Sequence, residues 1–129
     1  MKTVIFACVH NAGRSQMAAA FFNQLADSAS AHAVSAGTNP GDRVHPEVIA
    51  VMRESGIDLS AAVPRKLTSE LAAGAEMLIT MGCGDECPFI KAKHHEDWNI
   101  PDPRNMEDDD FRKVRDLIEE KVKALLEKI

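Results

Sequence analysis

The sequence lacks three features that would place it in large classes of proteins. No apolar run approaches the roughly 20 residues that a membrane-spanning helix needs. Acidic residues outnumber basic ones by 20 to 15, and the net charge of −5 argues against a general nucleic-acid-binding surface. The N-terminus has no basic segment followed by a signal-peptide cleavage site. We therefore expect a cytoplasmic protein with neither a membrane nor a nucleic-acid partner.

Cysteine is also scarce, with only Cys8, Cys83 and Cys87. An odd number of cysteines without an export signal argues against a static disulfide framework. Cysteines of cytosolic proteins that do pair tend to pair transiently, in catalysis or redox sensing. The chain of 129 residues has no repeat and no low-complexity tract, so we expect one domain over residues 1–129, acting as a monomer.

Strand and helix patterns alternate along the chain. Short apolar runs predict strands over residues 3–7, 32–36, 76–81 and 94–98. Helical periodicity begins at Arg14, at Pro46 and near Glu107, and Thr68 is expected to cap a short helix. His45, just before Pro46, is expected to be a cap or a surface residue. This alternation is typical of an α/β domain with a parallel sheet, whose ligands bind at the carboxyl ends of the strands.

The turn after the first predicted strand has the composition of an anion site with a nucleophile. Cys8 ends the strand, five residues follow, and Arg14 and Ser15 open the helix. Backbone N–H groups at a helix N-terminus favour an anion and a thiolate, and Arg14 can hold two oxygens of a tetrahedral ligand. Ser15 can donate a hydrogen bond to the Cys8 sulfur. Gly13 is expected to take a positive φ or to approach the ligand closely, and His10 to tune the anion site.

The same residues resemble a known family. The run from Cys8 to Ser15, with Ser35-Ala36-Gly37 and Asp102-Pro103, resembles the low-molecular-weight tyrosine phosphatase superfamily. The segment from Met81 to Pro88, with its two cysteines, is similar to the arsenate reductase branch, which is usually coupled to thioredoxin. The resemblance covers nearly the whole chain and implies a single-domain three-layer sandwich with a four-stranded parallel sheet of order 2-1-3-4.

The resemblance also implies a role for each site residue. Cys8 would be the nucleophile, with Arg14 gripping the anion, Ser15 stabilising the thiolate, Asn11 shaping the loop and Asp102 serving as general acid. Cys83 and Cys87 would be the redox cysteines. The substrate-binding loop would consist of Val9, His10, Asn11, Ala12, Gly13 and Arg14. No bound cofactor and no metal are implied; the electrons would come from thioredoxin, or from glutaredoxin or a small thiol such as mycothiol.

The implied reaction is a disulfide relay. Arsenate has the shape and charge of phosphate, so a phosphate cradle accepts it. The Cys8 thiolate attacks arsenic, Cys83 attacks the Cys8 sulfur, and Cys87 then attacks Cys83 and frees Cys8. A disulfide requires Cα atoms within ~7 Å, so Cys83 must reach the cradle in one state of the cycle, and we expect local unwinding of its segment on oxidation.

Two other functions fit parts of the pattern. A phosphomonoesterase or tyrosine phosphatase would use the same cradle, with Cys83 only protecting Cys8 by a reversible disulfide. A zinc-binding or sensor module could use Cys83, Cys87, His94 and His95 as ligands, although adjacent histidines are awkward ligands for one ion. Dependence of turnover on Cys83 and Cys87, and elemental analysis, discriminate between these alternatives.

Overall fold

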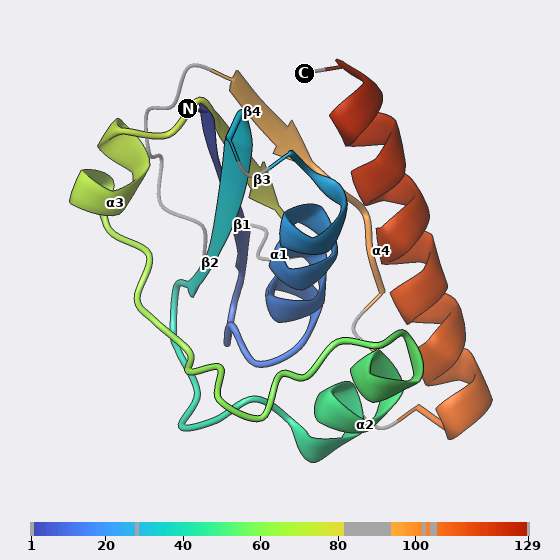
Figure 1. Ribbon diagram of the computed structural model, residues 1–129. Helices are drawn as coiled ribbons and strands as arrows, with labels where there is room; N and C mark the ends of the chain where they lie inside the picture. The colour runs from blue at the N-terminus through green and yellow to red at the C-terminus, as the bar shows by residue number, and fades with distance from the viewer. Residues whose placement is uncertain (1, 28, 82–93, 102, 104–105, 129) are drawn as a thin grey trace.

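The computed structural model describes residues 2–27, 29–81, 94–101, 103 and 106–128. Four parallel strands form one sheet in the order β2-β1-β3-β4 (Figure 1), which confirms the predicted fold class. The strands are β1 (Lys2–Cys8), β2 (Ala31–Gly37), β3 (Met77–Thr80) and β4 (His94–Asp97). The helices are α1 (Arg14–Leu25), α2 (Pro46–Glu54), α3 (Ser69–Ala73) and α4 (Asp108–Lys128).

Side chains of the central strand β1 point alternately to the two faces of the sheet, and both faces are covered by other elements. Val4, Phe6 and Cys8 belong to a core cluster with residues of α1, α2 and α4. Ile5 and Ala7 belong to a smaller cluster on the other face, which includes residues of α3. The continuous apolar run that predicted this strand therefore reflects a sheet covered on both sides.

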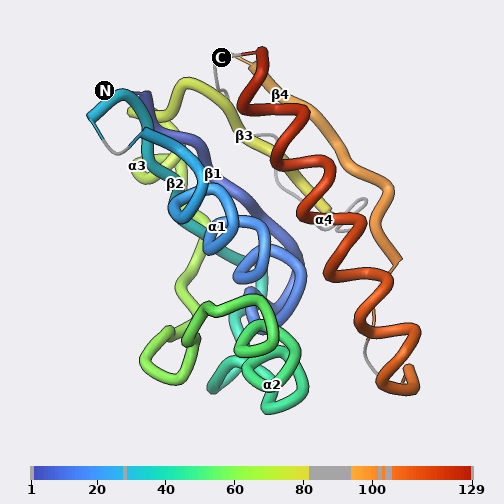
Figure 2. The backbone as a smooth tube through the Cα atoms, turned by 45° about the vertical axis from the view of Figure 1, so that its right-hand side comes forward, coloured from blue at the N-terminus to red at the C-terminus, as the bar shows by residue number. Residues whose placement is uncertain are grey.

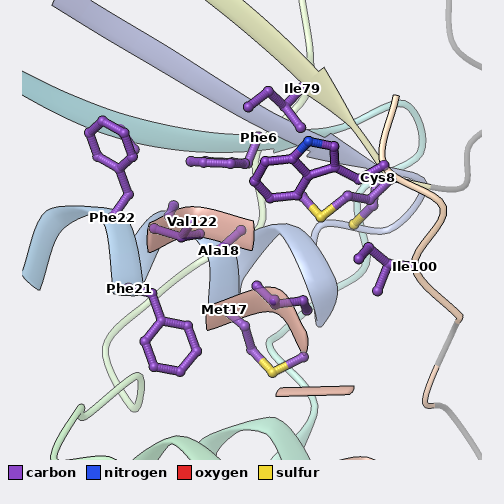
Figure 3. Close-up of a cluster of buried hydrophobic side chains, with 14 of the residues drawn as sticks. Phe6, Cys8, Met17, Ala18, Phe21, Phe22, Ile79, Ile100 and Val122 are labelled. Carbon is purple, nitrogen blue, oxygen red and sulfur yellow. The ribbon is translucent and has the colours of Figure 1, made fainter. Parts of the chain in front are cut away.

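The larger core is built on aromatic side chains from β1, α1 and the segment after β4. The ring of Phe6 lies 6.0 Å from that of Phe22 and 5.6 Å from that of Trp98, centroid to centroid. Figure 3 shows Phe6, Phe22 and Met17 grouped in this core, with Cys8 and Ile100 at one end of it. Trp98 thus serves as a packing residue.

Local signals for the ends of the helices are confirmed. Pro46 occupies the first turn of α2, and Gly56 follows this helix with a φ of +80°. Thr68 caps α3, because its Oγ1 accepts a hydrogen bond of 3.0 Å from the Leu71 N–H. Asp108, Asp109 and Asp110 lie in the first turn of α4, where the helix dipole favours negative charge. None of the helices among the described residues has the length and apolarity needed to cross a bilayer.

A cluster of charges joins α2 to α4. Glu54, at the end of α2, accepts hydrogen bonds of 2.9 Å from Arg112 Nε and Nη2 and one of 2.7 Å from Arg115 Nη1. Arg115 Nη1 also donates to the Val51 carbonyl. The hydrogen bonds from Arg112, and then those from Arg115, lower the pKa of Glu54 to about 2.

The two ends of the molecule are formed by different elements. The start of β1 and the end of α4 lie at one end, and α2 lies at the other (Figures 1 and 2). Cys8 ends β1 beside Gly37 of β2, since the two are paired in register. The carboxyl end of the central strand therefore faces the end of the molecule that α2 covers.

Candidate active site

The loop between β1 and α1 surrounds a small cavity. Cys8 is only 3% exposed, and α1 begins at Arg14 with Gly13 as its N-cap residue. From the loop and the start of α1, the cavity is lined by Cys8, His10, Ala12, Gly13 and Arg14. Its other walls are His45, Val48, Pro103 and Phe111. Residues predicted to bind an anion thus meet walls supplied by α2, by α4 and by the segment before α4.

The backbone of this loop is held from outside by the segment that follows β2. Four of its carbonyl groups accept hydrogen bonds of 2.8–3.2 Å from the N–H groups of residues 38, 39, 41 and 45; these carbonyls belong to Cys8, Val9, His10 and Ala12. The C=O and N–H of one peptide unit point in opposite directions, so the next N–H groups, at residues 9, 10, 11 and 13, are turned away from this segment. Donors converging on one side of a loop form a concave anion-binding site. The helix start adds residues 14–16, whose N–H groups have no acceptor within the helix.

Gly37 permits this close packing. A Cβ atom on Gly37 would lie 2.6 Å from the Val9 carbonyl oxygen and 3.0 Å from both Asn11 Cβ and the Asn11 nitrogen. Contacts of that length are repulsive, and two of the three atoms are backbone. The end of β2 can therefore lie against the loop only because position 37 has no side chain.

A chain of hydrogen bonds leads to the Cys8 sulfur. Asn11 Oδ1 accepts from the Arg65 backbone N–H at 2.9 Å, which can only donate, so the Asn11 amide nitrogen is the atom that faces Ser15. Asn11 Nδ2 donates to Ser15 Oγ at 2.8 Å, and Ser15 Oγ lies 2.9 Å from Cys8 Sγ. Because the serine oxygen already accepts from Asn11, its own proton is free to point at the sulfur. The arrangement stabilises a Cys8 thiolate.

Arg14 connects the loop to the segment after β4. Its Nη1 donates a hydrogen bond of 3.0 Å to the carbonyl oxygen of Ile100, which is 2% exposed. The guanidinium therefore has a fixed position at the edge of the cavity before any ligand arrives. Ile100 lies two residues before Asp102, the residue predicted to be the general acid.

The predicted site residues can now be placed. The loop from Val9 to Gly13 lies where the sequence predicted it, between Cys8 and Arg14; Val9 and Asn11 are not among the cavity walls. Cys83, Cys87 and Asp102 lie outside the described residues, so the relay and the general acid stay predictions. Of the two roles predicted for Gly13, a positive φ is not observed: its φ is −142°, and Asn11 has the positive value, 52°. Gly13 does line the cavity. Asparagine tolerates this conformation, and here hydrogen bonds at both its carbonyl and its side chain hold it.

Sequence reasoning missed three residues. Gln16, 6% exposed, donates from Nε2 to the Asn11 carbonyl at 3.0 Å and to Asn11 Oδ1 at 3.2 Å. Gly37 was predicted only as part of a motif. His45 is the N-cap residue of α2, as predicted, but its place in the cavity wall was not predicted. A polar residue on an otherwise apolar helix face was the available signal for Gln16; tertiary packing alone identifies the other two.

The predicted alternative of a zinc site loses part of its ligand set. His94 and His95 are consecutive residues of β4, so their side chains point to opposite faces of the sheet and cannot bind one ion together. His95 Nε2 instead lies 3.3 Å from Thr80 Oγ1, which donates to Asp97 at 2.6 Å. No group of three or more His, Cys, Asp or Glu side chains placed to hold a metal occurs within the described part of the chain.

Comparison with known proteins gives a family match over almost the whole chain. Residues 3–129 match the family described as low molecular weight phosphotyrosine protein phosphatase. A putative arsenate reductase of Halobacterium salinarum is 38% identical over 128 residues, covering 95% of this chain and 89% of that protein. A glutaredoxin arsenate reductase of Synechocystis sp. is 36% identical over 132 residues, covering 100% of this chain and 99% of that protein.

Solved structures of similar fold include reductases and a phosphatase. A thioredoxin-dependent arsenate reductase of Corynebacterium glutamicum has a TM-score of 0.84 at 35% identity; the match covers 99% of this chain but only 61% of that one. An arsenate reductase in the phosphate binding state has a TM-score of 0.87 at 34% identity, with 100% and 99% covered. An arginine phosphatase from Geobacillus stearothermophilus has a TM-score of 0.86 at 26% identity, with 99% and 92% covered.

Proposed function

The chain belongs to the low molecular weight phosphotyrosine protein phosphatase family, and we propose that it is an arsenate reductase, which converts arsenate to arsenite. Several similar relatives and solved structures carry that name. The observation that carries the proposal within this structure is the hydrogen-bond chain from Asn11 through Ser15 to the Cys8 sulfur, beside a loop of backbone donors.

The first step uses groups that the structure describes. Arsenate enters the loop as a tetrahedral oxyanion, with its oxygens facing the backbone N–H groups and the Arg14 guanidinium. The Cys8 thiolate attacks arsenic, one oxygen leaves as water after gaining protons, and a Cys8–S–As bond forms. Asp102 is proposed as the acid that protonates the departing oxygen. Ser15 stabilises the thiolate before the attack.

The second step reduces arsenic. Cys83, as thiolate, attacks the Cys8 sulfur; the S–As bond breaks, its electron pair stays on arsenic, and arsenite leaves. A Cys8–Cys83 disulfide remains. Cys87 then attacks Cys83, which forms a Cys83–Cys87 disulfide and releases Cys8 as thiolate. An external dithiol returns the two electrons by the same exchange chemistry and is itself oxidised to a disulfide.

The external dithiol is proposed to be thioredoxin. A structurally similar enzyme is named thioredoxin-dependent and a relative is named a glutaredoxin enzyme, so both donors occur among similar proteins. A relay that ends in a disulfide between two cysteines of this chain suits a dithiol donor, because such a donor can resolve the mixed disulfide with its own second thiol.

A second candidate is a phosphatase, favoured by the likeness to an arginine phosphatase. The cradle, Cys8 and Arg14 would serve phosphate transfer equally well, and neither downstream cysteine would be needed. Because a shared fold and cradle do not determine the substrate, the two functions are separated by their dependence on Cys83 and Cys87.

The deciding experiment follows arsenate-dependent NADPH oxidation with thioredoxin and thioredoxin reductase. Wild type is compared with Cys8→Ser, Cys83→Ser and Cys87→Ser, and hydrolysis of an aryl phosphate and of phosphoarginine is measured in parallel. Loss of arsenate turnover in all three variants supports the relay. Hydrolysis that needs Cys8 alone, with no arsenite formed by any donor, would establish the phosphatase instead.

A further inference from the structure

Gln16 occupies a gap in the hydrogen bonding that holds the anion loop. Four of the loop carbonyls are held by backbone N–H groups of residues 38–45, but the Asn11 carbonyl is not among them. Instead it accepts a hydrogen bond of 3.0 Å from Gln16 Nε2. A side chain from α1 therefore holds this carbonyl by a hydrogen bond, whereas backbone N–H groups of residues 38–45 hold the neighbouring carbonyls.

The orientation of the Asn11–Ala12 peptide determines whether the Ala12 N–H can face a bound anion. With the Asn11 carbonyl turned toward Gln16, the Ala12 N–H points the opposite way, and Ala12 is a wall of the cavity. Asn11 has a φ of 52°, in the left-handed region, which asparagine tolerates better than most residues but which contacts from the surroundings must still hold in place. Gln16, 6% exposed and anchored on the first turn of α1, is part of those surroundings.

The same amide of Gln16 also reaches the side chain of Asn11. Gln16 Nε2 lies 3.2 Å from Asn11 Oδ1, the atom that also accepts from the Arg65 N–H. Asn11 Nδ2 then donates to Ser15, which faces Cys8. One glutamine is thus coupled both to a backbone donor of the cradle and to the hydrogen bond at the nucleophile.

We propose that Gln16 is a positioning residue of the anion site, which fixes Asn11 and through it both the Ala12 N–H and the Ser15–Cys8 hydrogen bond. The inference deepens the proposed function, since it concerns the same site. Its test uses inorganic phosphate and the reactivity of Cys8, neither of which requires arsenate reduction. Failure of one hypothesis is therefore distinguishable from failure of the other.

The variants are Gln16→Leu, which removes the donor at similar size, and Gln16→Glu, which places a carboxylate against three oxygen acceptors, two on Asn11 and the Val63 carbonyl. Asn23→Leu is the matched control: Asn23 lies on α1, and its amide bonds the Ala33 backbone at 3.0 and 2.7 Å, away from the loop. All three lose side-chain bonds from the same helix, so thermal unfolding reports the common loss of stability.

The readout is alkylation of Cys8 by iodoacetamide as a function of pH, with and without phosphate. Trypsin releases residues 3–14 as a peptide whose only cysteine is Cys8, so mass spectrometry follows this thiol in the full chain. Among the described residues, His10, Arg14 and His45 are the charged or titratable side chains that share the cavity with Cys8, and all three remain in every variant.

We expect Gln16→Leu to weaken protection by phosphate about tenfold, the scale of one misaligned hydrogen bond, and to move the pH profile of alkylation to higher pH. Gln16→Glu changes both quantities further in the same direction, whereas Asn23→Leu changes neither. Phosphate protection and a pH profile equal to those of wild type in a folded Gln16→Leu protein would overturn the proposal. Equal shifts in Asn23→Leu would do so too, because they would assign the effect to general loss of stability.

Discussion

The Gly37→Ala substitution tests whether contact with β2 determines the shape of the anion loop. The added Cβ would lie 2.6 Å from the Val9 carbonyl oxygen, and ordinary contact begins at 3.4 Å, so the two backbones must separate by several tenths of an ångström. Overpacking of this kind costs about 1–3 kcal/mol. For a domain of this size that lowers the melting temperature by about 3–6 °C per kcal/mol.

The larger effect of this substitution is expected on catalysis. The Val9 carbonyl is bonded to the Asn39 N–H at 2.8 Å, and its displacement turns the adjoining N–H groups that face the anion. Misplacement of about 1 Å in a catalytic site can reduce turnover about 100-fold. We expect kcat/KM for arsenate, measured with thioredoxin and its reductase, to fall on that scale, together with protection of Cys8 by phosphate.

Two other glycines provide controls for this experiment. Gly56 has a φ of +80° and open space around it, so Gly56→Ala costs about 1–2 kcal/mol of backbone strain without touching the loop. Gly74 has neither a positive φ nor a neighbour within 4 Å of an added Cβ, so Gly74→Ala is expected to be nearly neutral. The reasoning is refuted if Gly37→Ala lowers stability as Gly56→Ala does and yet keeps full turnover and phosphate protection.

Three further outcomes follow from the described contacts. Ser15→Ala removes the hydroxyl 2.9 Å from Cys8 Sγ, and alkylation of Cys8 at neutral pH should slow several-fold; an unchanged rate would mean that Ser15 does not stabilise the thiolate. Glu54→Gln should lower the melting temperature at neutral pH. Because the pKa of Glu54 is about 2 in the folded protein and its ordinary value is 4.5, the advantage of wild type should be complete above pH 4.5 and disappear as pH falls toward 2; an advantage independent of pH would contradict this. Phe22→Ala, at a fully buried position of the main core, should cost about 3–5 kcal/mol in urea unfolding, and a cost under about 1 kcal/mol would mean that this core repacks freely.

Most of the fold could be predicted because local signals and burial agree. β1 is apolar and buried on both faces from Val4 to Cys8, while Pro46, Gly56 and Thr68 set helix ends through properties of single residues. Predicted strands fell within a residue or two of those observed, since apolar patterns do not define where a ladder of hydrogen bonds stops.

Within the site, the sequence predicted what is local and missed what is tertiary. Cys8, Arg14 and Ser15 could be found because the strand, the turn and the helix start follow one another in the chain. The positive φ was assigned to Gly13 on its intrinsic preference, whereas contacts from Gln16 and Arg65 impose it on Asn11. Gly37 could not be recognised as a packing requirement, because the register that brings it against the loop joins residues nearly thirty positions apart.

The pairing of β3 with β1 places the start of the segment that carries Cys83 beside the end of the strand that carries Cys8. Met81 donates a hydrogen bond of 2.8 Å to the carbonyl of Ala7, the residue before Cys8, and Cys83 is two residues further along the chain. Two peptide units span at most roughly 7 Å in any conformation, so the sequence separation by itself limits the distance between Met81 and Cys83. A short covalent tether raises the effective concentration of a thiol above that of a dissolved competitor. In the relay that we propose, the sheet would therefore favour capture of the arsenic adduct by a cysteine of the same molecule before a thiol from solution reaches it.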